Sequence, residues 1–240
     1  MKSRALFKCI IPISMCYISI MICADLLVYK FVSMPFGYTT AATLVFPLWF
    51  ILNDVIAEVY GPKLCWQMIW MGYIVQSFFN LFIYFGIHIA SPPGWNLQAY
   101  FDLVLGNLFR IELTTVIIFL ISIYINIRLL TKWKILMRGK YFWLRSIGSS
   151  GIGEAIYSIL NIWPMLLGSL ALSKLPILIF WSIAIKILYT IILAYPATIL
   201  VNFLKRVDGD FNDGIDFNPF KQDKNNPLQA EINNGNKFAC

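Results

Sequence analysis

The chain has 240 residues, of which 59% are hydrophobic and only 13% are charged, and its mean hydropathy is +0.72. Soluble globular chains carry about 25% charged residues, so this chain has too few charged side chains to cover a water-facing surface. The composition excludes a soluble enzyme, a nucleic-acid-binding domain and a secreted disulfide-rich scaffold. The net charge of +7 indicates basic loops on one side of a membrane rather than an acidic partner.

Six apolar segments reach the roughly 20 residues that a helix needs to cross a bilayer core of about 30 Å. In chain order they are 8–28, 39–60, 64–90, 109–130, 145–170 and 175–204. We therefore predict an all-α integral membrane protein whose six transmembrane helices occupy residues 1–206. Residues 91–107 are too polar to cross, and their Trp and Tyr are typical of an external interfacial loop or short helix.

The basic residues predict how these segments are oriented. Most of the 19 Lys and Arg residues precede the first segment, follow the second, surround the connection between the fourth and fifth, or follow the sixth. Because basic loops stay in the cytoplasm, both termini are predicted to be cytoplasmic. The N-terminus also resembles a secretory signal, but Ile22 stands where cleavage needs a small residue, so we expect an uncleaved span. Residues 207–240 are rich in Asn, Asp, Lys and Gly, which predicts a disordered cytoplasmic tail.

Ionisable side chains within the segments are candidate functional residues, because each charge at the bilayer centre costs at least about 2.5 to 3.5 kcal/mol. Asp54 and Glu58 are four residues apart, so both carboxylates lie on one helical face and repel each other. This arrangement requires a protonated carboxyl or a cationic or donor-rich group between them; a plain helix end at the cytoplasmic surface is the alternative. For Asp25, Arg110 and Glu112 an interfacial position is an equally good interpretation.

The fifth and sixth segments carry a second candidate pair. Glu154 follows a run of Gly and Ser where another helix or a flat ligand could approach the backbone, and Lys186 lies near the middle of the sixth segment. An ion pair between Glu154 and Lys186 would lower the cost of inserting both. Pro47 and Pro164 lie at corresponding positions of two three-helix halves, as in transporters built from inverted repeats. The five Cys and the single His show no metal-ligand spacing, so we predict no metal site, no cofactor and no catalytic residue.

Residues 53–61, with the sequence NDVIAEVYG, resemble the signature at the end of the second helix of the queuosine precursor transporters, also called the vitamin-uptake-like family. Further matches follow in order at Arg110, Ile111, Asn126, Gly139, Lys140, Trp143, Leu144, Arg145, Lys186, Tyr195 and Pro196. The resemblance covers roughly residues 10–205. It implies a six-helix fold similar to the substrate-binding subunits of energy-coupling-factor vitamin transporters. Two departures concern the ligand. Where the family usually has an acidic residue followed by Thr or Ser, this chain has Tyr157 and Ser158, and its acidic residue comes three positions earlier, at Glu154. Where the family often has Asp and Thr before the Pro, this chain has Ala194 and Tyr195 before Pro196.

The resemblance implies import of a queuosine precursor across the bacterial inner membrane for tRNA modification. The candidates are 7-cyano-7-deazaguanine, 7-aminomethyl-7-deazaguanine and queuine. A carboxylate can accept both N1–H and the 2-amino group of such a base, aromatic rings can stack on its faces, and a cation or amide can donate to its carbonyl oxygen. The predicted substrate-binding residues are Asn53, Asp54, Glu58, Tyr60, Arg145, Glu154, Tyr157 and Lys186.

Other readings of the sequence stay open. The chain has no Walker motif, so as a substrate-binding subunit of an ATP-driven vitamin uptake system it would need a separate energising module. A homo-oligomer is also compatible with the sequence, whereas a nucleic-acid partner is not expected. An intramembrane enzyme is disfavoured because His88 lies at the end of a segment and no metal ligands are paired, and a purely structural subunit does not require so many charges within the membrane.

Overall fold

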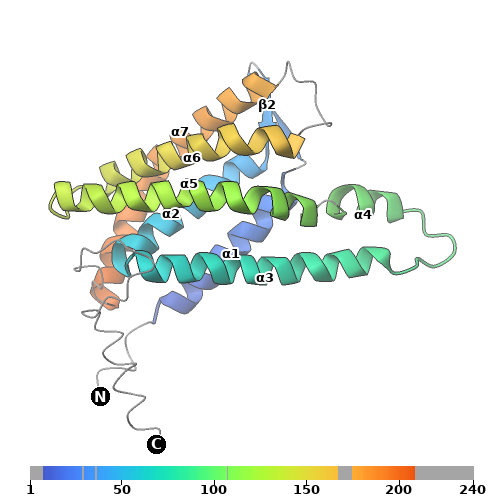
Figure 1. The fold of residues 1–240 in the computed structure, drawn as a ribbon, viewed down its shortest axis with the longest axis horizontal. Coiled ribbons are helices and arrows are strands. Elements are labelled where there is room, and N and C mark those ends of the chain that lie inside the picture. The colour runs from blue at the N-terminus through green and yellow to red at the C-terminus, as the bar shows by residue number, and fades with distance from the viewer. Residues whose placement is uncertain (1–7, 29, 36, 107, 167–174, 209–240) are drawn as a thin grey trace, which may run out of the picture.

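The computed structural model describes residues 8–28, 30–35, 37–106, 108–166 and 175–208, and consists mainly of helices (Figure 1). Its elements are α1 (Ile10–Leu26), β1 (Phe31–Met34), β2 (Gly37–Thr40), α2 (Ala42–Val59), α3 (Pro62–His88), α4 (Gln98–Leu105), α5 (Leu108–Leu136), α6 (Phe142–Leu166) and α7 (Leu175–Val207). Each predicted apolar segment coincides with one of the longer helices, and α4 lies where a short helix or interfacial loop is predicted. Beyond Asp208, the predicted tail lies outside the described residues.

Several of these helices are suited to cross a membrane. By length and composition the described residues contain four such stretches, namely α2, α3, the stretch Gln98–Leu136 and α7. Helix α1 is apolar but has only 17 residues. Helix α6 has 25 residues and contains several Gly and Ser residues together with Arg145 and Glu154. The chain is therefore a helical multi-pass membrane protein.

Helix α2 lies at the centre of the bundle, where it packs against α1, α3, α5, α6 and α7. Its aromatic side chains contribute much of the core. The Trp49 ring stacks on the Phe119 ring of α5 with a centroid distance of 3.8 Å, and the Phe46 ring stacks on Tyr157 of α6 at 4.3 Å. Because other helices enclose α2, the charged residues of this helix contact protein rather than lipid.

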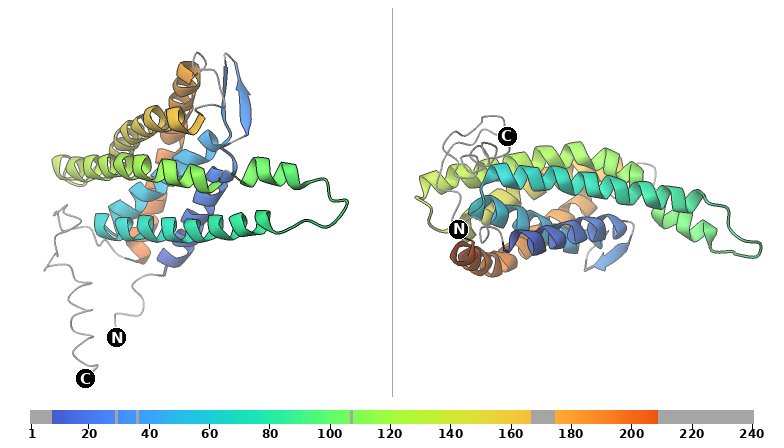
Figure 2. Two further views of the ribbon diagram at one scale, coloured as in Figure 1. Left: turned by 45° about the vertical axis from the view of Figure 1, so that its right-hand side comes forward. Right: turned by 90° about the horizontal axis from the view of Figure 1, so that it is seen from below.

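Helices α3 and α5 run side by side and carry α4 beyond the rest of the bundle (Figures 1 and 2). Their outward faces are apolar. The exposed side chains include Trp70, Phe78, Phe82, Phe85, Leu113 and Ile117. Such a surface would be unfavourable in water but matches the hydrocarbon of a bilayer.

The helices agree with the predicted all-α membrane class, and the structure adds one short antiparallel hairpin, in which β1 and β2 pair Phe31 with Thr40 and Met34 with Gly37. The second predicted span begins at Thr39, whereas the helix begins at Ala42. The hairpin residues are mostly aromatic or β-branched, which favours a strand. Strand β2 packs against α7, so the hairpin covers one end of the helical bundle.

The Gly and Ser run of α6 serves close helix packing. A Cβ atom on Gly153 would lie 2.9 Å from Cε1 of Phe50 and 3.1 Å from the backbone oxygen of Ser122, whereas a Cβ atom on Gly151 would meet nothing within 4 Å. Helix α6 therefore approaches α2 and α5 along the Gly153 face, and of the two sequence interpretations the structure favours helix packing at this residue.

We expect Gly153→Ala to lower the free energy of unfolding by about 1–3 kcal/mol, because the added methyl group overpacks the contact with α2 and α5. Gly151→Ala is the matched control and should change stability by no more than about 0.5 kcal/mol. Thermal unfolding of both variants in detergent measures the difference. Equal melting temperatures for the two variants would contradict the close approach at Gly153.

Candidate functional site

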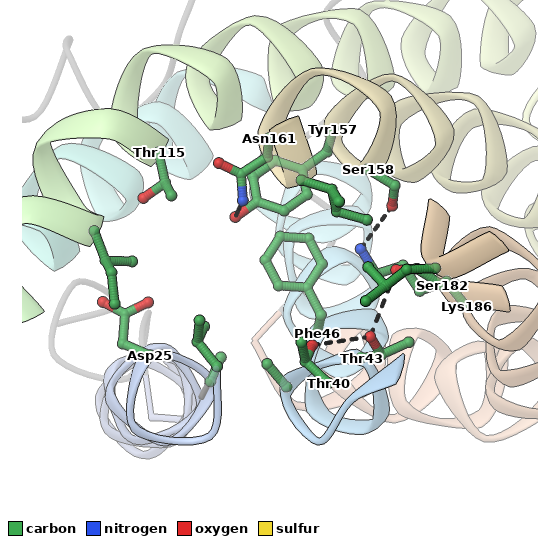
Figure 3. A pocket seen from close by; sticks show the side chains of 16 residues that line it. Asp25, Thr40, Thr43, Phe46, Thr115, Tyr157, Ser158, Asn161, Ser182 and Lys186 are labelled. Atoms are coloured by element: carbon green, nitrogen blue, oxygen red, sulfur yellow. Dashed lines mark hydrogen bonds between the residues drawn. The ribbon is translucent and has the colours of Figure 1, made fainter. Parts of the chain in front are cut away.

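A cavity of about 40 Å³ lies where α1, α2, α5, α6 and α7 meet beneath β2 (Figure 3). Its wall combines aromatic and aliphatic side chains with a set of polar ones. The polar lining residues are Asp25, Thr40, Thr43, Thr115, Tyr157, Ser158, Asn161, Ser182 and Lys186. Mostly apolar pockets with a few convergent polar groups are typical of small-molecule sites.

Lys186 is the cation of this wall and is only 4% exposed. Its Nζ donates a hydrogen bond to Oγ of Ser158 at 2.8 Å and lies 4.4 Å from the ring centroid of Phe46 and 5.1 Å from that of Tyr157. The ammonium group is thus in contact with two aromatic faces and one hydroxyl, and it forms no salt bridge with a carboxylate of the described residues.

The predicted ion pair between Glu154 and Lys186 does not form. Glu154 instead accepts a hydrogen bond from Oγ1 of Thr190 at 3.4 Å. Ser158 lies one helical turn after Glu154 on α6, and Lys186 reaches that later turn. The carboxylate of Glu154 therefore lies outside the cavity wall, although it still acts on Lys186 electrostatically.

The remaining polar side chains of the wall are ordered by hydrogen bonds among themselves. Nδ2 of Asn161 donates to the Tyr157 hydroxyl at 2.9 Å, and the hydroxyls of Thr43 and Ser182 lie 3.5 Å apart. Across the cavity from these groups lies Asp25 of α1, as Figure 3 shows. The cavity thus offers two stacked rings, one ammonium group, one carboxylate and several hydroxyl and amide groups.

A second group of charges, the Glu58 cluster, consists of Glu58, Lys134, Arg145 and Lys205. Arg145 is fully buried, and its guanidinium group forms two hydrogen bonds with the Glu58 carboxylate at 3.0 and 3.2 Å. Lys134 and Lys205 lie 3.4 and 3.3 Å from the same carboxylate. One carboxylate of α2 thereby joins the C-terminal ends of α5 and α7 to the start of α6.

Asp54, one turn earlier on α2, is bound by neutral donors. The hydroxyl groups of Ser146 and Ser150 both donate to Oδ2 of Asp54, the latter at 2.7 Å. Asn126 of α5 donates to Ser150 at 3.0 Å and extends this network. The cationic and donor-rich groups that the Asp54 and Glu58 pair requires are therefore side chains of α5, α6 and α7. Oδ1 of Asp54 is buried and has no hydrogen-bond partner among the described residues.

The other two signature residues, Asn53 and Tyr60, make one contact within α2 and one between helices. Nδ2 of Asn53 donates to the backbone oxygen of Trp49 at 2.9 Å, within α2. The Tyr60 hydroxyl donates to the Asp208 carboxylate at 2.6 Å, and the backbone N–H of Cys9 donates to the same oxygen at 3.2 Å. This contact joins the start of α1, the end of α2 and the end of α7.

A family model described as "Putative vitamin uptake transporter" matches residues 40–201, which is more than half of the chain. The chain belongs to this family. The family is the queuosine precursor transporter-like family, so the resemblance based on the NDVIAEVYG motif is confirmed. Neither the curated proteins nor the solved structures contain a match to the chain.

For this vitamin-uptake-type transporter, the structure divides the eight predicted site residues into two groups. Tyr157 and Lys186 lie on the cavity wall. Six others lie elsewhere, in the helix contacts described above. They are Asn53, Asp54, Glu58, Tyr60, Arg145 and Glu154. The family signature is thus engaged in packing α2 against its neighbours.

Sequence reasoning missed most of the wall. Thr43, Phe46 and Ser182 are ordinary residues of apolar helices, and nothing in their type marks a site. One signal was available: Ser182 and Lys186 are four residues apart, as are Tyr157 and Asn161, so each pair lies on one helical face. Asp25, for which the sequence leaves an interfacial position open, lies on the wall of the cavity.

Proposed function

We propose that this transporter imports a queuosine precursor, one of 7-cyano-7-deazaguanine, 7-aminomethyl-7-deazaguanine and queuine, across the bacterial inner membrane. Membership of the vitamin-uptake-type family carries the proposal. The cavity between α1, α2, α6 and α7 supports it, because its wall presents the groups that a 7-deazaguanine needs. Of the eight binding residues predicted from the sequence, this proposal keeps Tyr157 and Lys186. The other proposed binding residues come from the rest of the cavity wall.

The chemistry of the wall matches the edges of the base. The Asp25 carboxylate can accept N1–H and the 2-amino group together, and Lys186 can donate to the carbonyl oxygen. Phe46 and Tyr157 provide flat apolar faces for stacking.

The size of the cavity implies a change of conformation during transport. An engineered cavity of roughly 150 Å³ binds benzene. A cavity of about 40 Å³ is therefore too small for a larger, bicyclic base. Phe46 and Tyr157 are in stacking contact, so a base enters only when this pair separates. We propose that the described state is occluded and that transport alternates between states in which the cavity opens to either side.

Charge distribution supports the proposed topology of six spans with both termini in the cytoplasm. Lys134, Arg145 and Lys205 gather at one end of the bundle, around Glu58. The first residues of α1 lie at that end as well, because Cys9 contacts Asp208. Basic residues are enriched on the cytoplasmic side of membrane proteins, so this end is assigned to the cytoplasm.

Transport is tested by expressing the full chain in a bacterium that can neither make queuosine nor import its precursors but keeps the downstream enzymes. Each 7-deazapurine is supplied separately at low concentration, and queuosine in tRNA is assayed. We expect at least one precursor to restore the modification and an empty vector to restore none. Restoration only after an energising ATPase module is supplied would favour the alternative of a substrate-binding subunit. No restoration by any precursor, with the protein present in the membrane, would contradict the proposed substrate.

A further inference from the structure

A cluster of polar side chains lies beside the cavity, between α1, α3 and α5. It contains two carboxylates, Asp25 and Glu112, and three residues of α3. Nε2 of Gln76 donates to Asp25, Oγ of Ser77 donates to Glu112 at 2.5 Å, and Nδ2 of Asn80 donates to the other oxygen of Glu112 at 2.8 Å. Gln76, Asn80 and Glu112 are buried, at only 3%, 2% and 5% exposed, whereas Asp25 is half-buried and Ser77 lies at the exposed edge of the cluster.

The two carboxylates have no cationic partner in the described part of the chain. The ion pairs found there all involve Glu58, and Arg110, two residues before Glu112, is exposed. Besides Glu112, the titratable groups near Asp25 are the hydroxyls of Tyr73 and Tyr157, with Lys186 on the opposite wall of the cavity. Lys186 donates to Ser158, not to Asp25. Asp25 and Glu112 thus lie near enough to repel each other, and neither carboxylate forms an ion pair in the described residues.

The amide groups of the cluster add acceptors that lack a donor. Oε1 of Gln76 and Oδ1 of Asn80 are buried and have no hydrogen-bond partner, while their nitrogen atoms bind the two carboxylates. A buried acceptor without a donor is costly, and so is a buried negative charge without a positive one. Carboxylate and amide oxygens are the ligands that hard cations prefer. The same four residues therefore supply the ligands and the charge for a cation.

The number of carboxylates indicates the charge of that cation. Glu58 is matched by three cationic side chains, whereas the pair of Asp25 and Glu112 is matched by none. In the described residues no group of three or more His, Cys, Asp or Glu side chains gathers as it would around a transition metal. Two carboxylates with neutral amides suit a small monovalent cation, with the second charge offset by hydroxyl and amide donors.

We propose that Asp25, Gln76, Asn80 and Glu112 bind a small monovalent cation, H⁺ or Na⁺, and that this binding is linked to binding of the substrate. The link is Asp25, which belongs both to the cluster and to the wall of the cavity. A cation on the cluster holds Asp25 in place for the base, and by thermodynamic reciprocity the bound base strengthens cation binding. The role of the cation in transport rests on the proposed function, whereas the cation site itself does not.

Binding is tested on the purified full chain in detergent, without substrate. The melting temperature is measured as NaCl replaces N-methyl-D-glucamine chloride at constant ionic strength, and separately as a function of pH. A Na⁺ site gives a saturable rise in melting temperature with Na⁺. A proton site gives stability that falls as the pH rises, because the folded cluster then loses a proton that the unfolded chain does not hold.

Glu112→Gln is expected to abolish the response, since it removes one carboxylate and keeps the shape. Asp102→Asn is the matched control on α4, where Asp102 is exposed, and should respond like the wild type. Equal responses to Na⁺ and to pH in wild type and Glu112→Gln would overturn the proposal. If Glu112→Gln does not accumulate, Asp25→Asn is measured in its place. Independently of any variant, the site is overturned if the melting temperature of the wild type changes with neither Na⁺ nor pH.

A second measurement separates this inference from the transport proposal. Uptake of the active precursor is measured in membrane vesicles with an imposed Na⁺ or pH gradient. We expect collapse of one gradient to reduce uptake by roughly tenfold in the wild type and to have little effect on the residual uptake of Glu112→Gln. If collapse of neither gradient changes uptake, the link between cation binding and substrate binding is wrong, but the transport function is unaffected. A cation response in the binding experiment without any uptake leaves the site standing and removes the substrate proposal.

Discussion

Lys186→Met is expected to lower uptake of the queuosine precursor at least tenfold while leaving the protein folded. Lys186 supplies the ammonium group of the cavity wall, and a hydrogen bond to a charged donor contributes about 1.5–3 kcal/mol. The Met side chain has similar length and keeps the packing against Phe46 and Tyr157. It also relieves the cost of a buried ammonium group, so stability should not fall. The measurement is queuosine in tRNA as a function of the precursor concentration supplied.

Lys132→Met is the matched control, because Lys132 is exposed on α5 and belongs to neither the cavity nor the Glu58 cluster. It should import like the wild type. The amounts of both variants in the membrane are compared, so that a loss of uptake is not a loss of protein. Wild-type import by Lys186→Met at limiting precursor would exclude Lys186 from substrate binding and remove the main donor from the proposed site.

Glu58→Gln is expected to give the largest loss of stability, about 3–5 kcal/mol, because it leaves a fully buried guanidinium group without its carboxylate. The Arg145→Met variant should be less damaging, since Glu58 keeps Lys134 and Lys205. The double variant Glu58→Gln with Arg145→Met should be more stable than the sum of the two single effects predicts. Thermal unfolding of the four proteins measures this coupling.

The same variants distinguish a structural from a ligand-binding role for Glu58. If Glu58 holds the bundle together, the folded fraction of Glu58→Gln falls while the precursor concentration that gives half-maximal uptake stays the same. If Glu58 touches the precursor, as the sequence suggests, that concentration rises and stability changes little. A Glu58→Gln protein as stable as the wild type would show that packing of the helices that carry Lys134, Arg145 and Lys205 does not require the Glu58 carboxylate.

The helices could be predicted from the sequence because apolar length alone identifies them. The boundaries agree within a few residues for five of the six, for example 64–90 against Pro62–His88. The hairpin of β1 and β2 was missed because Thr39 and Thr40 continue the apolar run into α2, and hydropathy does not separate a strand from the first turn of a helix.

The partners of the charges could not be predicted. Glu58 and Arg145 are 87 residues apart in the sequence, and only the packing of α6 on α2 brings them together. The free-energy cost of placing a charge in the membrane shows that a carboxylate needs a partner, but it does not show whether that partner is another side chain or a ligand. In this chain Asp54 and Glu58 contact α6, whereas the cavity wall contains residues such as Thr43 and Ser182, whose types are common in any membrane helix.

Helix α7 carries Lys186 on the cavity wall and, nineteen residues later, Lys205 in the Glu58 cluster. Between them stands Pro196, which has no N–H to donate to the carbonyl group of Ile192, so the helix is weakest there. A helix deforms most readily where its hydrogen-bond ladder is interrupted. The contact between Lys205 and Glu58 and the position of Lys186 on the cavity wall therefore lie on opposite sides of the most deformable turn of α7.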